Sequence, residues 1–237
     1  MTERSSDKVS RSADHFQVGP SQITKERDHI AIDVCETGAP LPYPVRGRIR
    51  IYPEVMTDKA IRLDSDGYHM WWPVAPRGRI EVEFDRPSLS WQGTSYVDTN
   101  AGVVPLEASF KRWDWCRANL DDGIAVLYDV EGREGHRESL ALWIDETGQI
   151  KDFLPPRPQS LPTTFWRVAR KTQVDEGQTA RVVETLEDSP FYARSIIETS
   201  LLQQRCTAMH ESLSLDRFAQ PIVKAMLPFR MPRTYWP

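Results

Sequence analysis

Apolar and polar residues alternate with a period of two along many short stretches of this chain. In one of them, Ile30, Ile32 and Val34 alternate with smaller or more polar neighbours. Because successive side chains of a β-strand point to opposite faces, this pattern predicts a strand with one buried face and one wet face. Further stretches that we interpret as strands are residues 45–51, 80–85, 89–96, 124–130, 139–145, 149–153, 165–170, 180–186 and 205–213.

Clear helical character is confined to residues 220–227, where Pro221 lies near the expected first turn. Many strands, turn signals at short spacing and one short C-terminal helix predict an all-β fold of antiparallel barrels or sandwiches. Residues 1–14 are charged, Ser-rich and aperiodic, so we expect a disordered tail there. An aromatic cluster that begins after residue 105 predicts a boundary between two β domains, 15–105 and 106–237.

The composition narrows the possible function classes. Of the 237 residues 40% are hydrophobic, enough for a core, and a net charge of −4 argues against a bulk electrostatic nucleic-acid binder. Cys35, Cys116 and Cys206 form no CxxC pair, which disfavours zinc ribbons and suits a reduced, cytoplasmic setting. The sequence has no Gly-rich phosphate loop, GxSxG or HExxH motif, and no apolar run of about 20 residues that would predict a membrane span.

The segment GYHMWWPVAP (67–76) is the first candidate for chemistry. His69 and Trp71 are two residues apart, so on a strand they share a face, and Pro73 is expected to end that strand. A titratable ring beside a large aromatic surface suits an active site. The alternative is that His69 only caps an aromatic cluster, with Trp71 and Trp72 in the core.

The segment SYVDTNAG (95–102) is the second candidate. Tyr96 and Asp98 share one face of an extended segment. If that face borders an apolar cavity, burial would hold the Asp98 carboxyl protonated at neutral pH, as a general acid requires. The alternative is that Asp98 caps a turn over residues 99–102, which is a common use of aspartate.

Two further polar positions favour a structural interpretation. Asp114 lies between two tryptophans, most simply on the polar side of a strand whose aromatic face is core. His210 and Glu211 point to opposite faces of a predicted strand and so do not form an obvious catalytic pair.

A family resemblance rests on long strings rather than on a short motif. The segment GYHMWWPVAPRGRIEVEFDRPSLSWQGTSYVDTNAGVVPLEASFKRWDWCRA strongly resembles the carotenoid 1,2-hydratases of purple bacteria, and the similarity continues through GIAVLYDV, TLEDSPFYARSIIET and TAMHESLSLDRFAQPIVKAMLPFRMPR. The resemblance implies two lipocalin-like β domains and cofactor-free addition of water to the terminal C1–C2 double bond of acyclic carotenoids such as neurosporene and lycopene. Family members are longer before the region that matches residue 15, so we expect the N-terminal domain to be partial.

The resemblance also implies the site residues, which are His69, Trp71, Tyr96 and Asp98. Asp98 is expected to be the general acid and His69 to orient or deprotonate the water, although these two roles could be exchanged. Trp71 and Tyr96 are expected to shape the site around a tertiary cation. The resemblance implies no cofactor and no metal.

The expected partners are the acyclic carotenoid and a membrane surface, which places the protein at the cytoplasmic side of the inner, photosynthetic membrane as a peripheral protein. Residues 227–237 carry aromatic and basic side chains that could form an interfacial lip, or could simply pack as a chain end. Two other functions stay open, namely a non-catalytic carrier of carotenoid or lipid and a cyclase-type relative that acts on another polyene.

Overall fold

The all-β, antiparallel fold class is confirmed by the structure, a computed structural model that describes residues 4–38 and 41–227. The first sheet has the strand order β1-β2-β3-β4-β5-β7-β6, with β8 also paired to β7. Its strands are β1 (Val9–Arg11), β2 (His15–Val18), β3 (Ser21–Lys25), β4 (Ile30–Thr37), β5 (Pro44–Val55), β6 (Ile61–Arg62), β7 (His69–Arg86) and β8 (Leu89–Gly102).

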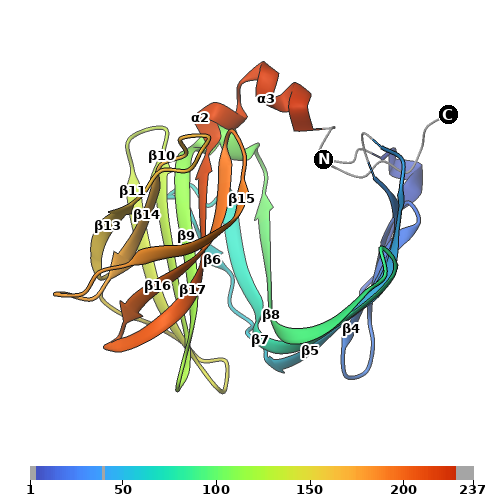
Figure 1. Cartoon of the computed structure of the whole chain (residues 1–237), viewed down its shortest axis with the longest axis horizontal. Coiled ribbons are helices and arrows are strands. Elements are labelled where there is room, and N and C mark those ends of the chain that lie inside the picture. Colours follow the sequence, from blue (N-terminus) through green and yellow to red (C-terminus); the bar gives the residue numbers. More distant parts are fainter. Residues whose placement is uncertain (1–3, 39–40, 228–237) are drawn as a thin grey trace. The chain divides into compact units, whose positions relative to one another are not determined.

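The second sheet has the order β12-β11-β10-β9-β17-β16-β15, and Figure 1 shows β9, β10, β16 and β17 side by side. Among the described residues its end strands do not pair with each other, so this sheet does not close into a barrel. Its strands are β9 (Phe110–Leu120), β10 (Gly123–Gly132), β11 (Arg137–Asp145), β12 (Ile150–Asp152), β15 (Arg181–Asp188), β16 (Tyr192–Leu201) and β17 (Gln204–Ser214).

A separate hairpin and a few short helices complete the described chain. β13 (Arg157–Leu161) pairs with β14 (Arg170–Val174). The helical elements are η1 (Ser6–Lys8), α1 (Leu106–Ser109), α2 (Leu215–Phe218) and α3 (Pro221–Met226). The helix predicted over 220–227 is therefore confirmed as α3, whereas α1 and α2, of four residues each, were not predicted.

The chain forms two compact units that are not continuous in sequence. One contains the residues up to Met56 together with Arg77–Val97 and the described residues from Lys224, and the other contains Thr57–Pro76 and Asp98–Val223. The boundary near residue 105 between two sequence-continuous domains stays a prediction.

In the first unit, the alternating stretches pair as the pattern predicts. Ile30 lies opposite Ile51 and Ile32 opposite Ile49 across the β4–β5 pair, which places apolar side chains beside one another. On the polar positions of the same pair, the Arg48 guanidinium binds Asp33 with an Nε–Oδ1 distance of 2.5 Å.

The expected tail is more ordered than its composition predicts. Within it, η1 is followed by β1, whose Val9 pairs with Val18 of β2. The Arg4 guanidinium also binds Glu36, 2.5 Å away. The prediction of a disordered tail over 1–14 is thus wrong for residues 4–11. This segment has no alternation of apolar residues, but the pairing of β1 with β2 and the Arg4–Glu36 ion pair order it. Residues 1–3 lie outside the described residues.

Two strand predictions differ from the structure in an informative way. Residues 165–169 are a loop, and only Arg170 of the predicted strand 165–170 belongs to β14. Pro73 does not end its strand, because β7 continues to Arg86. β6 pairs with β7 up to Trp71 and β5 takes over from Arg77, so Pro73 lies where its missing N–H breaks no hydrogen bond to either strand.

In the second unit, β10 is buried on both faces rather than on one. Ala125 and Leu127 point into a cluster with Ile197 and Leu201 from β16. The residues on the opposite face of β10, which are Ile124, Val126 and Tyr128, are also buried. The central strand of the sheet therefore has the main core on one face and a second packed surface on the other.

We expect Ile197→Ala to lower the free energy of unfolding by about 2–5 kcal/mol, because it deletes a fully buried side chain from this cluster and leaves a cavity. Val183→Ala is the matched control on exposed β15 and should change the stability by less than about 0.5 kcal/mol. Urea unfolding followed by tryptophan fluorescence measures both. Equal effects of the two substitutions would contradict the described core.

Candidate active site

His69 is the first residue of β7 and its side chain is almost fully buried. Its ring Nδ1 lies 2.7 Å from Oδ2 of Asp64, and its Nε2 lies 3.1 Å from the carbonyl oxygen of Val104. The backbone N–H of Tyr68 also donates to Asp64, at 2.8 Å. Both ring nitrogens of His69 therefore have protein partners.

Both partners of the His69 ring can accept hydrogen bonds. The Val104 carbonyl only accepts hydrogen bonds, so Nε2 must donate to it. Burial alone would raise the pKa of the Asp64 carboxyl, but the hydrogen bonds from the His69 side chain and from the backbone outweigh it and lower this pKa below its ordinary value. The ionised Asp64 carboxylate thus serves as the acceptor beside Nδ1 of the buried ring.

Gly102, the last residue of β8, lies against the His69 ring. A Cβ atom built on Gly102 would lie 2.6 Å from Cδ2 of His69, so no larger residue fits there without moving the ring. Together with the hydrogen bond between His69 and Val104, this packing joins the start of β7 to the end of β8.

β8 continues through Gly102 and has no turn over residues 99–102. The alternative that Asp98 caps such a turn is therefore excluded.

Asp98 and Trp71 form the central contact of the site. The fully buried Trp71 donates from its indole Nε1 to Oδ2 of Asp98 at 2.8 Å. Asp98 is half-buried. The structure thus brings together two of the residues that the sequence singled out, from the first part of β7 and the last part of β8.

A continuous series of ring contacts connects Trp71 back to His69. The centroid distances are 5.4 Å from Trp71 to Tyr128, 5.9 Å from Tyr128 to Trp113, 6.2 Å from Trp113 to Phe110 and 4.9 Å from Phe110 to His69. Several of these pairs meet edge to face, which is the favoured geometry for aromatic rings.

A β-bulge brings two of these rings together. Phe110 and Arg112 of β9 pair with Gly132 and Glu131 of β10, which leaves Lys111 as an extra residue. Strict alternation would put Phe110 and Trp113 on opposite faces, but one inserted residue reverses the phase and lets their rings meet.

Sequence reasoning missed Tyr128, Phe110 and Asp64. Burial is the main cause that raises the pKa of the Tyr128 hydroxyl, and the charge of Asp98 adds to it. The sequence marked Tyr128 only as one of the alternating residues of strand 124–130, with nothing to connect it to Trp71, and the bulge concealed Phe110. For Asp64, the turn sequence DSDG just before His69 was the available signal.

Tyr96 belongs to the first unit and is half-buried. Its part in the site stays a prediction. Trp72 lies next to Trp71 in β7 but has different partners, because its Nε1 donates to the carbonyl and the hydroxyl oxygen of Thr57 at 3.1 and 3.0 Å.

A second polar cluster lies in the same unit, between β9, β14 and β17. Asp114 is buried and accepts from the Arg112 guanidinium, the Lys171 N–H and the Ser212 hydroxyl. His210 is fully buried, and its Nε2 donates to the Lys171 carbonyl at 2.6 Å. Its Nδ1 has no hydrogen-bond partner, which fits a neutral ring. Each group here is held as part of the sheet packing.

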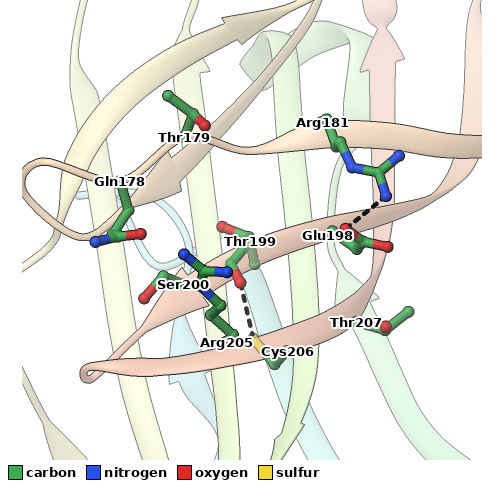
Figure 2. Close-up of a pocket in the computed structure, with 9 residues that line it drawn as sticks. All are labelled: Gln178, Thr179, Arg181, Glu198, Thr199, Ser200, Arg205, Cys206 and Thr207. Atoms are coloured by element: carbon green, nitrogen blue, oxygen red, sulfur yellow. Dashed lines mark hydrogen bonds and ion pairs between the residues drawn. The ribbon is translucent and has the colours of Figure 1, made fainter.

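Figure 2 shows a cavity of about 400 Å³ elsewhere in this unit. Its lining is polar, and Arg181 and Glu198 form an ion pair of 2.7 Å within it. It contains none of the predicted site residues and does not suit a long apolar chain. Among residues 4–38 and 41–227, no three His, Cys, Asp or Glu side chains gather as metal ligands would.

We expect Gly102→Ala to destabilise the protein by about 1–3 kcal/mol, because the new methyl group must displace the His69 ring or the end of β8. Gly132→Ala is the control, since its Cβ would meet neighbours at ordinary contact distances of 3.5 Å or more. Chemical denaturation compares the two. A Gly102→Ala protein as stable as the wild type would contradict the close approach to His69.

The burial of His210 predicts a loss of stability in mild acid. Burial lowers the pKa of His210 from its ordinary value of 6.5, so between that value and the lower folded-state pKa the unfolded chain binds more protons than the folded one. The free energy of unfolding should therefore fall as the pH drops below about 6.5. His210→Gln should flatten this dependence, whereas His136→Gln, at an exposed ring, should leave it unchanged. Unfolding midpoints measured from neutral to mildly acidic pH test this.

Similarity to known proteins identifies the family of this chain. The family model described as carotenoid hydratase CrtC matches residues 1–236. An acyclic carotenoid 1,2-hydratase of Thiocapsa roseopersicina is 49% identical over 98% of the chain, and one of Rubrivivax gelatinosus is 41% identical over 98%. The chain spans 58% of the length of both relatives.

A crystal structure of a protein named AttH from Nitrosomonas europaea covers 88% of the chain, and the chain covers 72% of that structure. The TM-score is 0.57 at 12% sequence identity, so this likeness concerns the fold alone and agrees with the expected lipocalin-like β architecture. The resemblance found in the sequence is confirmed by the family match. The chain belongs to the CrtC carotenoid hydratase family.

Proposed function

We propose that this chain is a hydro-lyase that adds water to the terminal C1–C2 double bond of an acyclic carotenoid such as neurosporene or lycopene. The family supports the reaction class, and the observation that carries the assignment of residues is the hydrogen bond from Trp71 to Asp98 within a series of aromatic rings. The product is a tertiary 1-hydroxy carotenoid.

The reaction sets three requirements on the site. A proton must reach carbon 2, which leaves a tertiary cation at carbon 1. A water oxygen then bonds to carbon 1, and the resulting oxonium loses one proton. The site therefore needs a protonated acid, a surface that tolerates a cation, and a base for the last proton.

Asp98 is the acid in this proposal. The Trp71 indole N–H can only donate, so Oδ2 of Asp98 must accept from it. In this proposal the acidic proton is therefore carried by the other oxygen, Oδ1. When that proton passes to carbon 2, the same N–H stabilises the carboxylate that remains. The carboxylate can then take the proton from the attacking water, which regenerates the acid.

The rings of Trp71, Tyr128 and Trp113 are the groups that suit the cation. An aromatic face contributes about 0.5–2 kcal/mol to a nearby cation where water is excluded. Since burial raises the pKa of Tyr128, its hydroxyl stays neutral at ordinary pH. Tyr96 is kept as a further residue that shapes the site.

We assign His69 to positioning. Its ring holds Asp64 on one side and Val104 on the other, and so ties the start of β7 to the segment that follows Asp98. Deprotonation of water by His69, as the sequence suggested, would require one of these two hydrogen bonds to open. An exchange of roles with Asp98 would require the same.

The proposed partners are the carotenoid and, because such polyenes dissolve in lipid, a membrane surface to which the protein binds peripherally. Within the described ranges, no helix is long and apolar enough to span a bilayer. The interfacial lip expected over residues 227–237 falls, beyond Leu227, outside the described residues.

We expect Asp98→Asn to lower the rate of water addition by about 10²–10⁴-fold, because the amide cannot deliver the proton. Trp71→Phe keeps a ring but loses the donor to the carboxylate, for which a loss of about tenfold to a hundredfold is expected. Trp72→Phe is the matched control and should stay within about threefold of the wild type, since its indole donates to Thr57 instead.

The assay supplies lycopene or neurosporene in liposomes and detects a product heavier by one water by mass spectrometry. Pigment that is bound but unaltered would favour a carrier, and a product of unchanged mass would favour a cyclase. Full activity of folded Asp98→Asn would refute the assignment of the acid.

A further inference from the structure

Two aromatic side chains are exposed in the loop between β13 and β14. Phe165 is 88% exposed and Trp166 is 44% exposed, and their rings meet edge to face with centroids 6.1 Å apart. Single exposed apolar residues are common, but two adjacent exposed rings in contact form a small apolar patch of the kind found at interaction sites. This Phe165–Trp166 pair takes no part in the proposed reaction.

Hydrogen bonds hold the backbone of this loop. Thr164 and Val168, on either side of the exposed residues, are buried, and the Thr164 N–H donates to the Val168 carbonyl at 3.3 Å. The Arg217 guanidinium donates to the Trp166 carbonyl at 2.7 Å. Arg167 adopts a positive φ of 58°, and its N–H donates to the Thr164 carbonyl at 2.9 Å. The aromatic pair is therefore presented outward by a fixed turn.

A pocket of about 220 Å³ adjoins the loop, at the sheet edge where β9 begins and β10 and β17 end. We call it the basic pocket. Its charged lining consists of four basic and two acidic side chains, which are Lys111, Arg112, Arg167, Arg217, Glu131 and Asp216.

The basic pocket keeps an excess of positive charge. Asp216 already binds Arg133 at 2.7 Å, and Glu131 binds Arg137 at 3.5 Å, so other arginines balance both carboxylates. Arg112 is itself paired with Asp114, so the excess lies on Lys111, Arg167 and Arg217. Within the described part of the chain, the side chains of Lys111 and Arg167 form no hydrogen bond or ion pair. This excess is local, because the whole chain has a net charge of −4.

We propose that the basic pocket and the Phe165–Trp166 pair dock the protein on an anionic phospholipid surface, with a headgroup phosphate in the pocket and the two rings in the interface. Aromatic rings prefer the headgroup level of a bilayer, and lysines and arginines near an anionic surface add attraction. This inference rests on the proposed function, since a carotenoid substrate resides in the membrane. It also places docking next to the site, because Lys111 directly follows Phe110, whose ring contacts His69.

The cavity of Figure 2 provides the comparison within the same unit. There Arg181 is neutralised by Glu198. Arg205 also lines that cavity and, like Arg167, forms no ion pair with a described residue, but the described lining of that cavity contains no aromatic side chain. Arg205 is therefore a matched control for a basic residue outside the docking surface.

The experiment is co-sedimentation with vesicles of phosphatidylcholine alone and of phosphatidylcholine with phosphatidylglycerol. We expect binding of the wild type to the mixed vesicles only, and weaker binding as salt is added. Arg167→Glu should lower the partition coefficient by about tenfold or more, and Arg205→Glu should leave it nearly unchanged. Phe165→Ser should lower it by about fivefold or more, whereas Leu154→Ser, at an equally exposed apolar residue, should not.

Three results would overturn the docking surface. One is that the wild type does not bind mixed vesicles, and another is that Arg167→Glu and Arg205→Glu lose equal amounts of binding. The third is calorimetric binding of inorganic phosphate at the basic pocket without vesicle binding, which would make the pocket a site for a free anion.

Turnover with carotenoid in detergent separates the docking proposal from the proposed function. Arg167→Glu should keep the wild-type turnover in detergent. Absence of turnover in the wild type would refute the proposed hydratase function, and the sedimentation result would still decide whether the docking surface exists.

Discussion

A buried polar atom without a partner costs free energy, and this constraint organises the candidate site. Trp71 can bring its indole N–H into the interior because Asp98 accepts from it, and His69 can be buried because Asp64 and Val104 accept from its two nitrogens. The bonds from Trp71 to Asp98 and from His69 to Val104 link residues far apart in sequence. They fix the end of β8, and hence the carboxyl group, against the aromatic surface of β9 and β10.

The period of two was sufficient to predict most strands and the all-β class, but not the burial of each face. β10 lies in the middle of its sheet and is covered on both sides, so Ala125 and Leu127 are buried as well as the alternating residues that include Tyr128. β16 was missed because its inward residues include Ala193 and Ser195, which are small or polar and give little apolar signal. In each case tertiary packing outweighed the local pattern.

The residues of the site were easier to predict than their arrangement. His69, Trp71 and Asp98 stood out through their spacing and family resemblance, and the Trp71–Asp98 contact joins two of them. Phe110 could not be found from spacing, because a bulge at Lys111 changes the phase of β9. The contact of His69 with Val104 depends on where β8 ends, which only the pairing of strands determines.

The same unit contains two aspartates that meet different kinds of hydrogen-bond donor. The buried Asp114 accepts from a guanidinium, a backbone N–H and a hydroxyl, a set of donors that includes a cation. Asp98 accepts from the neutral indole N–H of Trp71, whose ring contacts Tyr128. A neutral donor stabilises a carboxylate less than a cation does. The donors that each aspartate meets depend on which strands pair and pack together, and neither WDW nor YVD reveals them.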